Sequence, residues 1–306
     1  MKTIKKTGII GAGCLGIMFY QMFEKKYGRG SVFFIADKER IERYARDGIY
    51  CNGEKCDFNF VDKDEPCGDV DLIMFANKFT TIDEAIEAVC GFVGEETILI
   101  SIINGIASEQ VIGERLNDEH LLYCVVHGMD STKRGKEVTY SQTGKVIFGD
   151  RFNRKTEDLE AVYKYMSEAG VNCMVPEDIR QKMWSKLMFN VGVNQVSAVF
   201  NCSYAGLQRP GKERDIMLKA MGEARKVASL EGVVISDEDL DEWMRILSEL
   251  TPESMPSMQQ DVLAKRKTEL GLFAGTIRRL AEKHGVDTPV NDYLYDELVK
   301  IEASWG

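Results

Sequence analysis

The sequence lacks a long apolar run and an excess of positive charge, and each absence excludes a class of protein. No stretch approaches the roughly 20 consecutive apolar residues that a membrane-spanning helix requires. The formal net charge is −10 at pH 7, which argues against nucleic acid or an anionic membrane as the main partner. A small anionic substrate is still allowed, because a few local cations can dominate a cleft.

Histidine is scarce and cysteine is scattered, so we expect no metal site. The chain has three histidines, and none stands with a carboxylate at metal-ligand spacing. The eight cysteines include no C-x-x-C pair, which favours reduced thiols in a cytoplasmic protein. The lysines and apolar residues at the start imitate a secretion signal only superficially, because glycines interrupt the run and no clear small-residue cleavage site follows.

What is present predicts two folded domains. A chain of 306 residues with 44% hydrophobic content can bury two cores. Up to about residue 176, apolar strand patterns alternate with helical ones, and beyond it helical patterns follow one another. We therefore predict an α/β domain over residues 1–176 and an all-α C-terminal domain over residues 177–306.

A glycine motif follows the first apolar strand pattern and opens a helical one. Its glycines are Gly11, Gly13 and Gly16, in the spacing G-x-G-x-x-G. In this setting the first glycine permits a tight turn, the second lets a pyrophosphate approach the backbone, and the third lets the helix pack on the strand. We therefore predict a Rossmann-type NAD(P)-binding domain, with Cys14 and Leu15 in the same cofactor-binding turn. A glycine-rich turn without a ligand is the alternative.

The second strand pattern, Phe33–Ala36, ends where such folds bind the adenosine ribose. Asp37 stands there and can accept hydrogen bonds from both ribose hydroxyls, while its charge would repel the 2′-phosphate of NADP. Lys38 and Arg40 argue the opposite, unless they only form the charged start of a surface helix. The choice between NAD(H) and NADP(H) stays open on these residues.

Two further strand patterns end in polar residues. Lys78 follows Asp69–Ala76, and Asn104 follows Glu96–Ile103. Ligands of open α/β sheets bind at the carboxyl ends of the strands, so both side chains are expected on a polar rim over the cofactor cleft. The alternative is that each is an ordinary loop residue.

The first helical pattern of the C-terminal domain carries one polar stripe on an apolar helix. Lys186, Asn190 and Asn194 recur at i, i+4 and i+8. A buried lysine is costly unless a carboxylate or an anionic ligand compensates it. A later helical region offers Ser257 and Glu269, which could complete a polar pocket between the domains. The alternative is a lysine that extends to solvent and asparagines that bond neighbouring helices.

Taken in order, these motifs resemble those of the ketopantoate reductases (2-dehydropantoate 2-reductases). The resemblance runs through nearly the whole chain, and the ordered combination is specific, although many dehydrogenases share the glycine motif. The residues that carry it are the G-x-G-x-x-G turn, Lys78, Asn104-Gly105, Lys186-x-x-x-Asn190-x-x-x-Asn194, Ser257-Met258-x-Gln260-Asp261 and Lys267-Thr268-Glu269.

The resemblance implies an NADPH-dependent oxidoreductase that reduces the 2-keto group of ketopantoate to pantoate in pantothenate biosynthesis. Lys186 would be the general acid that protonates the alkoxide as hydride arrives, and Glu269 would support the substrate and its protonation. The chemistry agrees, because hydride addition creates negative charge on oxygen and a nearby ammonium stabilises and neutralises it.

The resemblance also assigns binding residues. Asn190, Asn194 and Ser257 would hold the hydroxyl and carboxylate groups of the substrate. Lys78 and Asn104 would line the nicotinamide side of the cleft, where Asn104 can touch both cofactor and substrate. The helices of the second domain offer apolar surface for a homodimer.

Departures from the family pattern leave alternatives open. The family has a basic residue at the position of Asp37, so NADH is allowed beside NADPH. The segment Leu270–Gly275 lacks the acidic residue and the asparagine usual in the family, so another 2-keto acid or 2-hydroxy acid is an alternative substrate. A regulator that binds NAD(P) without catalysis is a further alternative, although it would have no need of a proton donor such as Lys186.

Overall fold

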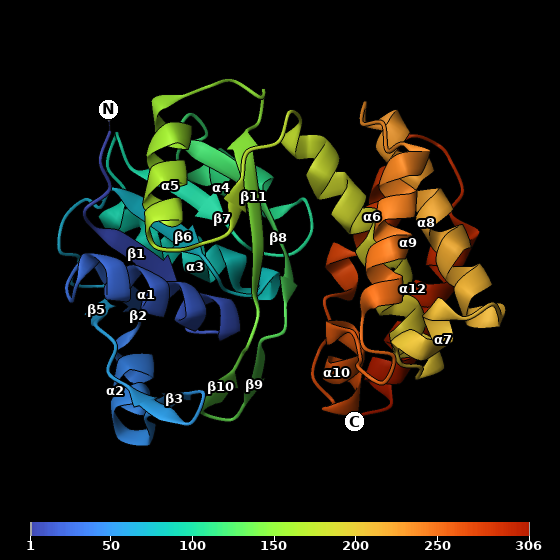
Figure 1. Cartoon of the computed structure of the whole chain (residues 1–306), viewed down its shortest axis with the longest axis horizontal. Coiled ribbons are helices and arrows are strands. Elements are labelled where there is room, and N and C mark those ends of the chain that lie inside the picture. The colour runs from blue at the N-terminus through green and yellow to red at the C-terminus, as the bar shows by residue number, and fades with distance from the viewer. Residues whose placement is uncertain (1, 306) are drawn as a thin grey trace. The chain divides into compact units, whose positions relative to one another are not determined.

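The computed structural model describes residues 2–305, and contacts divide the chain into two compact units. The first, called here the sheet unit, ends at Ile179 and omits Gly105–Ala107. The second, called the helical unit, comprises Gly105–Ala107 and the chain from Arg180 onward. In the described residues strands and helices alternate through the first unit, and helices build the second (Figure 1), which confirms the predicted fold class.

An eight-stranded sheet forms the centre of the sheet unit, in the order β12-β11-β8-β7-β6-β1-β2-β5. Every neighbouring pair is parallel except β8 and β11. Its inner strands are buried along their whole length, as expected for a parallel sheet covered on both faces. The strands are β1 (Thr7–Ile10), β2 (Val32–Ala36), β5 (Phe60–Asp62), β6 (Leu72–Phe75), β7 (Ile98–Ser101), β8 (Leu121–Met129), β11 (Thr143–Asp150) and β12 (Cys173–Met174).

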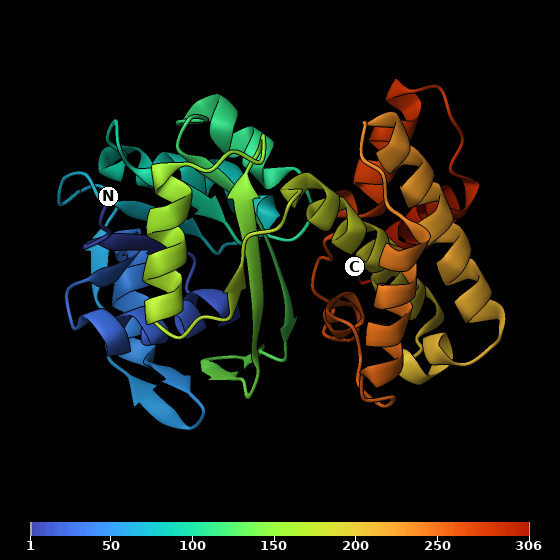
Figure 2. The same ribbon diagram turned by 45° about the horizontal axis from the view of Figure 1, so that its top comes forward.

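Helices cover this sheet, and aromatic side chains pack two of them together. Tyr165 of α5 stacks on Tyr27 of α1 with 4.4 Å between ring centroids, and Phe23 of α1 lies 4.8 Å from the same ring. Both views show α1 and α5 beside each other (Figure 1 and Figure 2). The helices are α1 (Cys14–Tyr27), α2 (Lys38–Asp47), α3 (Ile82–Val89), α4 (Ser108–Arg115) and α5 (Glu157–Glu168), with 3₁₀ turns η1 (Phe79–Thr81) and η2 (Cys90–Phe92).

A second, four-stranded sheet joins two distant parts of the chain, and the sequence did not predict it. Its order is β4-β3-β10-β9, and Tyr50 of β3 pairs in parallel with Glu137 of β10. The phenol of Tyr140 donates to Oε1 of Gln21 on α1 at 3.0 Å, which ties this sheet to the first helix. The strands are β3 (Ile49–Cys51), β4 (Glu54–Cys56), β9 (Thr132–Arg134) and β10 (Glu137–Thr139).

In the helical unit helices follow one another, as the sequence predicts. A 3₁₀ turn and a shorter helix follow Glu269, with a break between them before Ala274. Gln195 accounts for the break, because its Oε1 accepts the Ala274 N–H at 3.0 Å and so fixes the start of the shorter helix. The elements are α6 (Ile179–Phe200), α7 (Tyr204–Gln208), α8 (Lys212–Leu230), α9 (Asp237–Glu249), α10 (Ser257–Leu263), η3 (Leu270–Leu272), α11 (Ala274–Lys283) and α12 (Pro289–Ala303).

Candidate active site

The glycine turn lies between β1 and α1, and the protein itself explains two of its glycines. Gly11 has φ +109°, and a Cβ there would come within 2.6 Å of the backbone at Ala76 and Asn77. A Cβ on Gly16 would collide with the carbonyl oxygen of Gly11. Both positions therefore require glycine for the fold alone.

Gly13 is different, and this difference indicates a ligand. Its φ is −87°, and a Cβ there would meet only the Ala76 carbonyl oxygen at 3.7 Å, an ordinary contact. The fold therefore tolerates a side chain at this position, whereas a pyrophosphate approaching the backbone would not. Cys14 and Leu15 begin α1 with side chains packed on the core, so their backbone is what they can offer a ligand. These residues fit a dinucleotide.

Asp37 lies directly after β2, where the sequence placed it, but it also serves the fold. It is the N-cap of α2, and its Oδ1 accepts the Arg40 N–H at 2.7 Å. Its Oδ2 lies 3.3 Å from Nε of Arg40, and Lys38 is exposed in the first turn of the helix. An acid and a base thus stand together where a ribose or a 2′-phosphate would bind.

Lys78 and Asn104 follow β6 and β7, which are adjacent and parallel, so the structure brings them to one edge of the sheet. Lys78 is the N-cap of η1, and its carbonyl oxygen accepts hydrogen bonds from Asn77 Nδ2 at 2.9 Å and Thr81 Oγ1 at 2.9 Å. Within residues 2–305, Oδ1 of Asn77 is buried and accepts no hydrogen bond. An unsatisfied acceptor beside Gly11 is a second feature that fits a bound ligand.

A buried carboxyl group lies just after this edge, and the sequence analysis missed it. Glu109 of α4 is fully buried. Ser101 donates to Ser108 at 2.9 Å, and Ser108 donates to Oε2 of Glu109 at 2.9 Å. No hydrogen bond reaches Oε1 from the part of the chain that the structure describes. Burial raises the pKa of Glu109 to about 7. Hydrogen bonds from Ser108 and the backbone lower this pKa, but their effect is smaller than that of burial.

In the helical unit, the structure brings together three of the predicted substrate-binding residues. Asn190 and Asn194 are buried on α6, and Asn194 Nδ2 donates to Asn190 Oδ1 at 3.3 Å. Oδ1 of Asn194 accepts hydrogen bonds from Ser257 Oγ at 3.1 Å and from the Met258 N–H at 3.2 Å. Asn194 therefore also holds the first turn of α10, which is the structural role considered as the alternative.

The two predicted catalytic residues lie on different elements of the same unit. Lys186 is half-buried on α6, one helical turn before Asn190. Glu269 is half-buried and directly precedes η3. The sequence spacing alone indicated that Lys186 shares a face with the asparagines, and the helix bears this out.

A second polar network in the helical unit was not predicted. Gln195 is fully buried and its Nε2 donates to the Val191 carbonyl at 2.7 Å and to Asn291 Oδ1 at 3.3 Å. Nδ2 of Asn291 donates to Glu223 Oε2 at 2.8 Å. Buried amides of this kind satisfy one another and fix how helices pack, so this network is structural.

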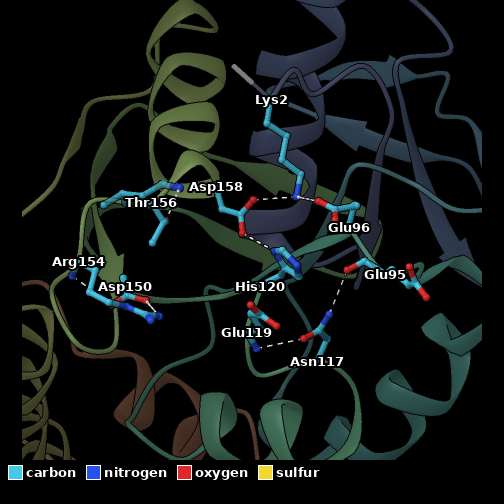
Figure 3. Close-up of polar contacts among 11 residues, drawn as sticks. Lys2, Glu95, Glu96, Asn117, Glu119, His120, Asp150, Arg154, Thr156 and Asp158 are labelled. Carbon is cyan, nitrogen blue, oxygen red and sulfur yellow. Dashed lines mark hydrogen bonds and ion pairs between the residues drawn. The ribbon is translucent and has the colours of Figure 1, made fainter.

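The charged cluster in Figure 3 is also structural. Asp158 accepts from Lys2 Nζ at 2.8 Å and lies 2.5 Å from His120 Nδ1, while Glu96 lies 3.2 Å from Lys2. The cluster therefore ties the start of the chain to α5.

Among residues 2–305 no group of three histidine, cysteine, aspartate or glutamate residues could hold a metal ion. No helix in the same range is long and apolar enough to cross a membrane.

Comparison with known families gives two matches that together cover most of the chain. A family model described as ketopantoate reductase PanE/ApbA matches residues 7–152. The model of the C-terminal region of the same family matches residues 178–302.

Curated relatives carry the same name. A 2-dehydropantoate 2-reductase of Vibrio cholerae is 26% identical over 240 residues, which are 77% of this chain and 79% of that protein. A 2-dehydropantoate 2-reductase of Aquifex aeolicus is 24% identical over 305 residues, 98% of this chain and 97% of that protein.

Solved structures share the fold. D-mandelate dehydrogenase in a ternary structure with NADH and anilino(oxo)acetate has a TM-score of 0.86 at 22% identity, with 98% of both chains covered. A dimeric ketopantoate reductase from Staphylococcus aureus has a TM-score of 0.81 at 21% identity, with 98% of this chain and 100% of that chain covered.

Proposed function

Because the chain belongs to the ketopantoate reductase family, we propose that it is an NAD(P)H-dependent reductase of a 2-keto acid. The proposal rests on Gly13. The fold does not require a glycine at this position, whereas a bound dinucleotide would require one. Lys186 is a second support for the proposal. It is half-buried beside two buried asparagines, and it offers a cation to the carboxylate of a substrate and to its reacting oxygen.

The proposed substrate is ketopantoate, reduced to pantoate in pantothenate biosynthesis. The names of the curated relatives support it. The second candidate is another pair of 2-keto and 2-hydroxy acids, which the likeness to D-mandelate dehydrogenase and the apolar segment after Glu269 favour.

The proposed mechanism assigns each polar side chain a role. Reduced nicotinamide, when bound, supplies a hydride to the 2-keto carbon. The Lys186 ammonium stabilises the negative charge that develops on the 2-keto oxygen and donates the proton that completes the alcohol. Asn190, Asn194 and Ser257 orient the acid, and Glu269 supports the proton donor. Lys78 and Asn104 hold the nicotinamide side.

We also propose that the Asp37–Arg40 pair sets cofactor preference. Arg40 partly neutralises Asp37 and could itself bind a 2′-phosphate, whereas Asp37 can accept from ribose hydroxyls. Both NADPH and NADH are therefore expected to bind. Replacing Arg40 with Met should weaken NADPH more than NADH, whereas equal effects on the two cofactors would contradict this role.

The test of the function is the initial rate of oxidation of NADPH and, separately, NADH, with ketopantoate present and absent. A ketopantoate-dependent rate supports the proposal, and the ratio of the two rates gives the cofactor preference. A panel of other 2-keto acids follows if ketopantoate gives none. Tight cofactor binding without turnover of any acid would favour a regulator that binds NAD(P) without catalysis.

A homodimer is the proposed assembly. A relative of the same fold is described as dimeric, and the helical unit exposes large apolar side chains such as Leu230 and Val234. Light scattering of the purified protein should give twice the 34.5 kDa chain mass, and a single chain mass would refute the dimer.

A further inference from the structure

A lysine of the small sheet reaches the glycine turn. Nζ of Lys133, on β9, donates to the carbonyl oxygen of Ala12 at 2.8 Å. Ala12 stands between Gly11 and Gly13, so the ammonium lies beside the backbone that a dinucleotide pyrophosphate would approach. Resting on the proposed function, we infer that Lys133 is a phosphate-binding residue of the cofactor site.

The register of the small sheet explains why this lysine points inward. Lys133 pairs directly with Val138 of β10, and directly paired residues project from the same face of a sheet. Val138 is fully buried and belongs to the core of the sheet unit. Lys133 therefore extends from the face that packs on this unit, rather than from the solvent face.

The small sheet is held firmly enough to position the ammonium. Tyr140, which follows β10, donates to Gln21 of α1 at 3.0 Å, and Nε2 of Gln21 donates to Cys56 Sγ of β4 at 3.6 Å. The sheet is thus tied to α1, whose N-terminus faces the turn, just after β10, the neighbour of β9, and at β4, its opposite edge.

Lys133 keeps N–H donors that can serve a bound anion. An ammonium has three N–H donors, and the Ala12 carbonyl takes one. Within residues 2–305, no carboxylate forms an ion pair with Lys133. In a chain with a net charge of −10, a partly buried cation at this place attracts an anion, and a pyrophosphate beside Gly13 would accept its remaining N–H groups.

The experiment measures binding of ADP-ribose, which carries the pyrophosphate but no nicotinamide, by calorimetry. The variants are Lys133→Met, Lys133→Arg and the control Lys136→Met. Lys136 lies in the same hairpin, is exposed, and contacts the Tyr50 ring at 5.0 Å. Adenosine, followed by ligand-observed NMR, reports on the site without phosphate.

We expect Lys133→Met to weaken ADP-ribose about tenfold to a hundredfold, the range for a lost charge-assisted hydrogen bond. The variant should also depend less on ionic strength, Lys133→Arg should bind better than Lys133→Met, and Lys136→Met should bind as the parent does. Adenosine binding should not change.

Unchanged ADP-ribose binding by Lys133→Met would overturn the inference. An equal loss of adenosine and ADP-ribose would overturn it too, because it would show that Lys133 only shapes the turn. If the parent protein binds neither NADH, NADPH nor ADP-ribose, both the inference and the proposed function fail. If dinucleotides bind but their affinity is the same in the Lys133 variants, the inference fails and the proposed function stands.

Discussion

Replacing Glu109 with Gln should remove a pH-dependence of stability that the buried carboxyl group creates. Glu109 is fully buried, and its pKa rises from 4.5 to about 7 because burial disfavours the charged form. Between pH 4.5 and about 7, Glu109 therefore keeps its proton in the folded chain but loses it in the unfolded chain. Its contribution to stability is fully present below pH 4.5 and is lost as the pH rises through 7.

The magnitude follows from the two pKa values. A difference of about 2.5 pKa units corresponds to about 3 kcal/mol over the whole range, of which about 2 kcal/mol falls between roughly pH 5.5 and 8. Glutamine has the shape of the protonated acid but cannot ionise. The parent should therefore lose about 2 kcal/mol relative to Glu109→Gln across that interval.

Urea unfolding followed by circular dichroism at several pH values measures this difference. Tyr123, whose pKa is raised by burial and by Glu109, stays neutral over the interval and does not contribute. Glu114→Gln is the matched control, since Glu114 is exposed on the same helix. A stability gap between the parent and Glu109→Gln that does not change with pH would refute the reasoning.

Three further predictions concern the candidate site. Lys186→Met should lower kcat by about 10²- to 10⁴-fold, as loss of a general acid does, while the cofactor Kd measured by fluorescence stays the same; equal turnover would sink the assignment. Gly13→Ala should fold normally but bind NAD(P)H at least about tenfold more weakly, whereas Gly11→Ala should be destabilised in thermal unfolding; undiminished binding by Gly13→Ala would contradict the argument. Asn194→Ala should lose about 1–3 kcal/mol in urea unfolding because Met258 N–H and Ser257 lose their acceptor; a free energy of unfolding equal to the parent's would refute this role.

Much of the sheet unit could be predicted because its signals are local. The glycine turn sits between a buried strand and a helix, and continuous apolar runs such as Leu72–Phe75 read as parallel strands. The small sheet could not be predicted in this way. Its strands are three residues long, and Tyr50 meets Glu137 only through the tertiary fold.

The candidate site shows the same division. The i, i+4 spacing on α6 predicted that Lys186 and the asparagines share one face, because the periodicity of a helix fixes it. The helix break before Ala274 depends on Gln195, a residue from another helix. The burial of Glu109 could not be predicted, because a glutamate next to a serine gives no sign of burial in the sequence. The pocket between the two domains, like the roles of its residues, stays a prediction.

The central claim is hydride transfer to a 2-keto acid, and isotope transfer tests it most directly. The protein is incubated with ketopantoate and NADPH or NADH carrying deuterium at both C4 positions of the nicotinamide, and the product is examined by mass spectrometry and NMR. The account predicts pantoate with deuterium on C2, made by the parent and made far more slowly by Lys186→Met. The claim would be contradicted if the cofactor binds but neither ketopantoate nor any other 2-keto acid tested is reduced or gains deuterium.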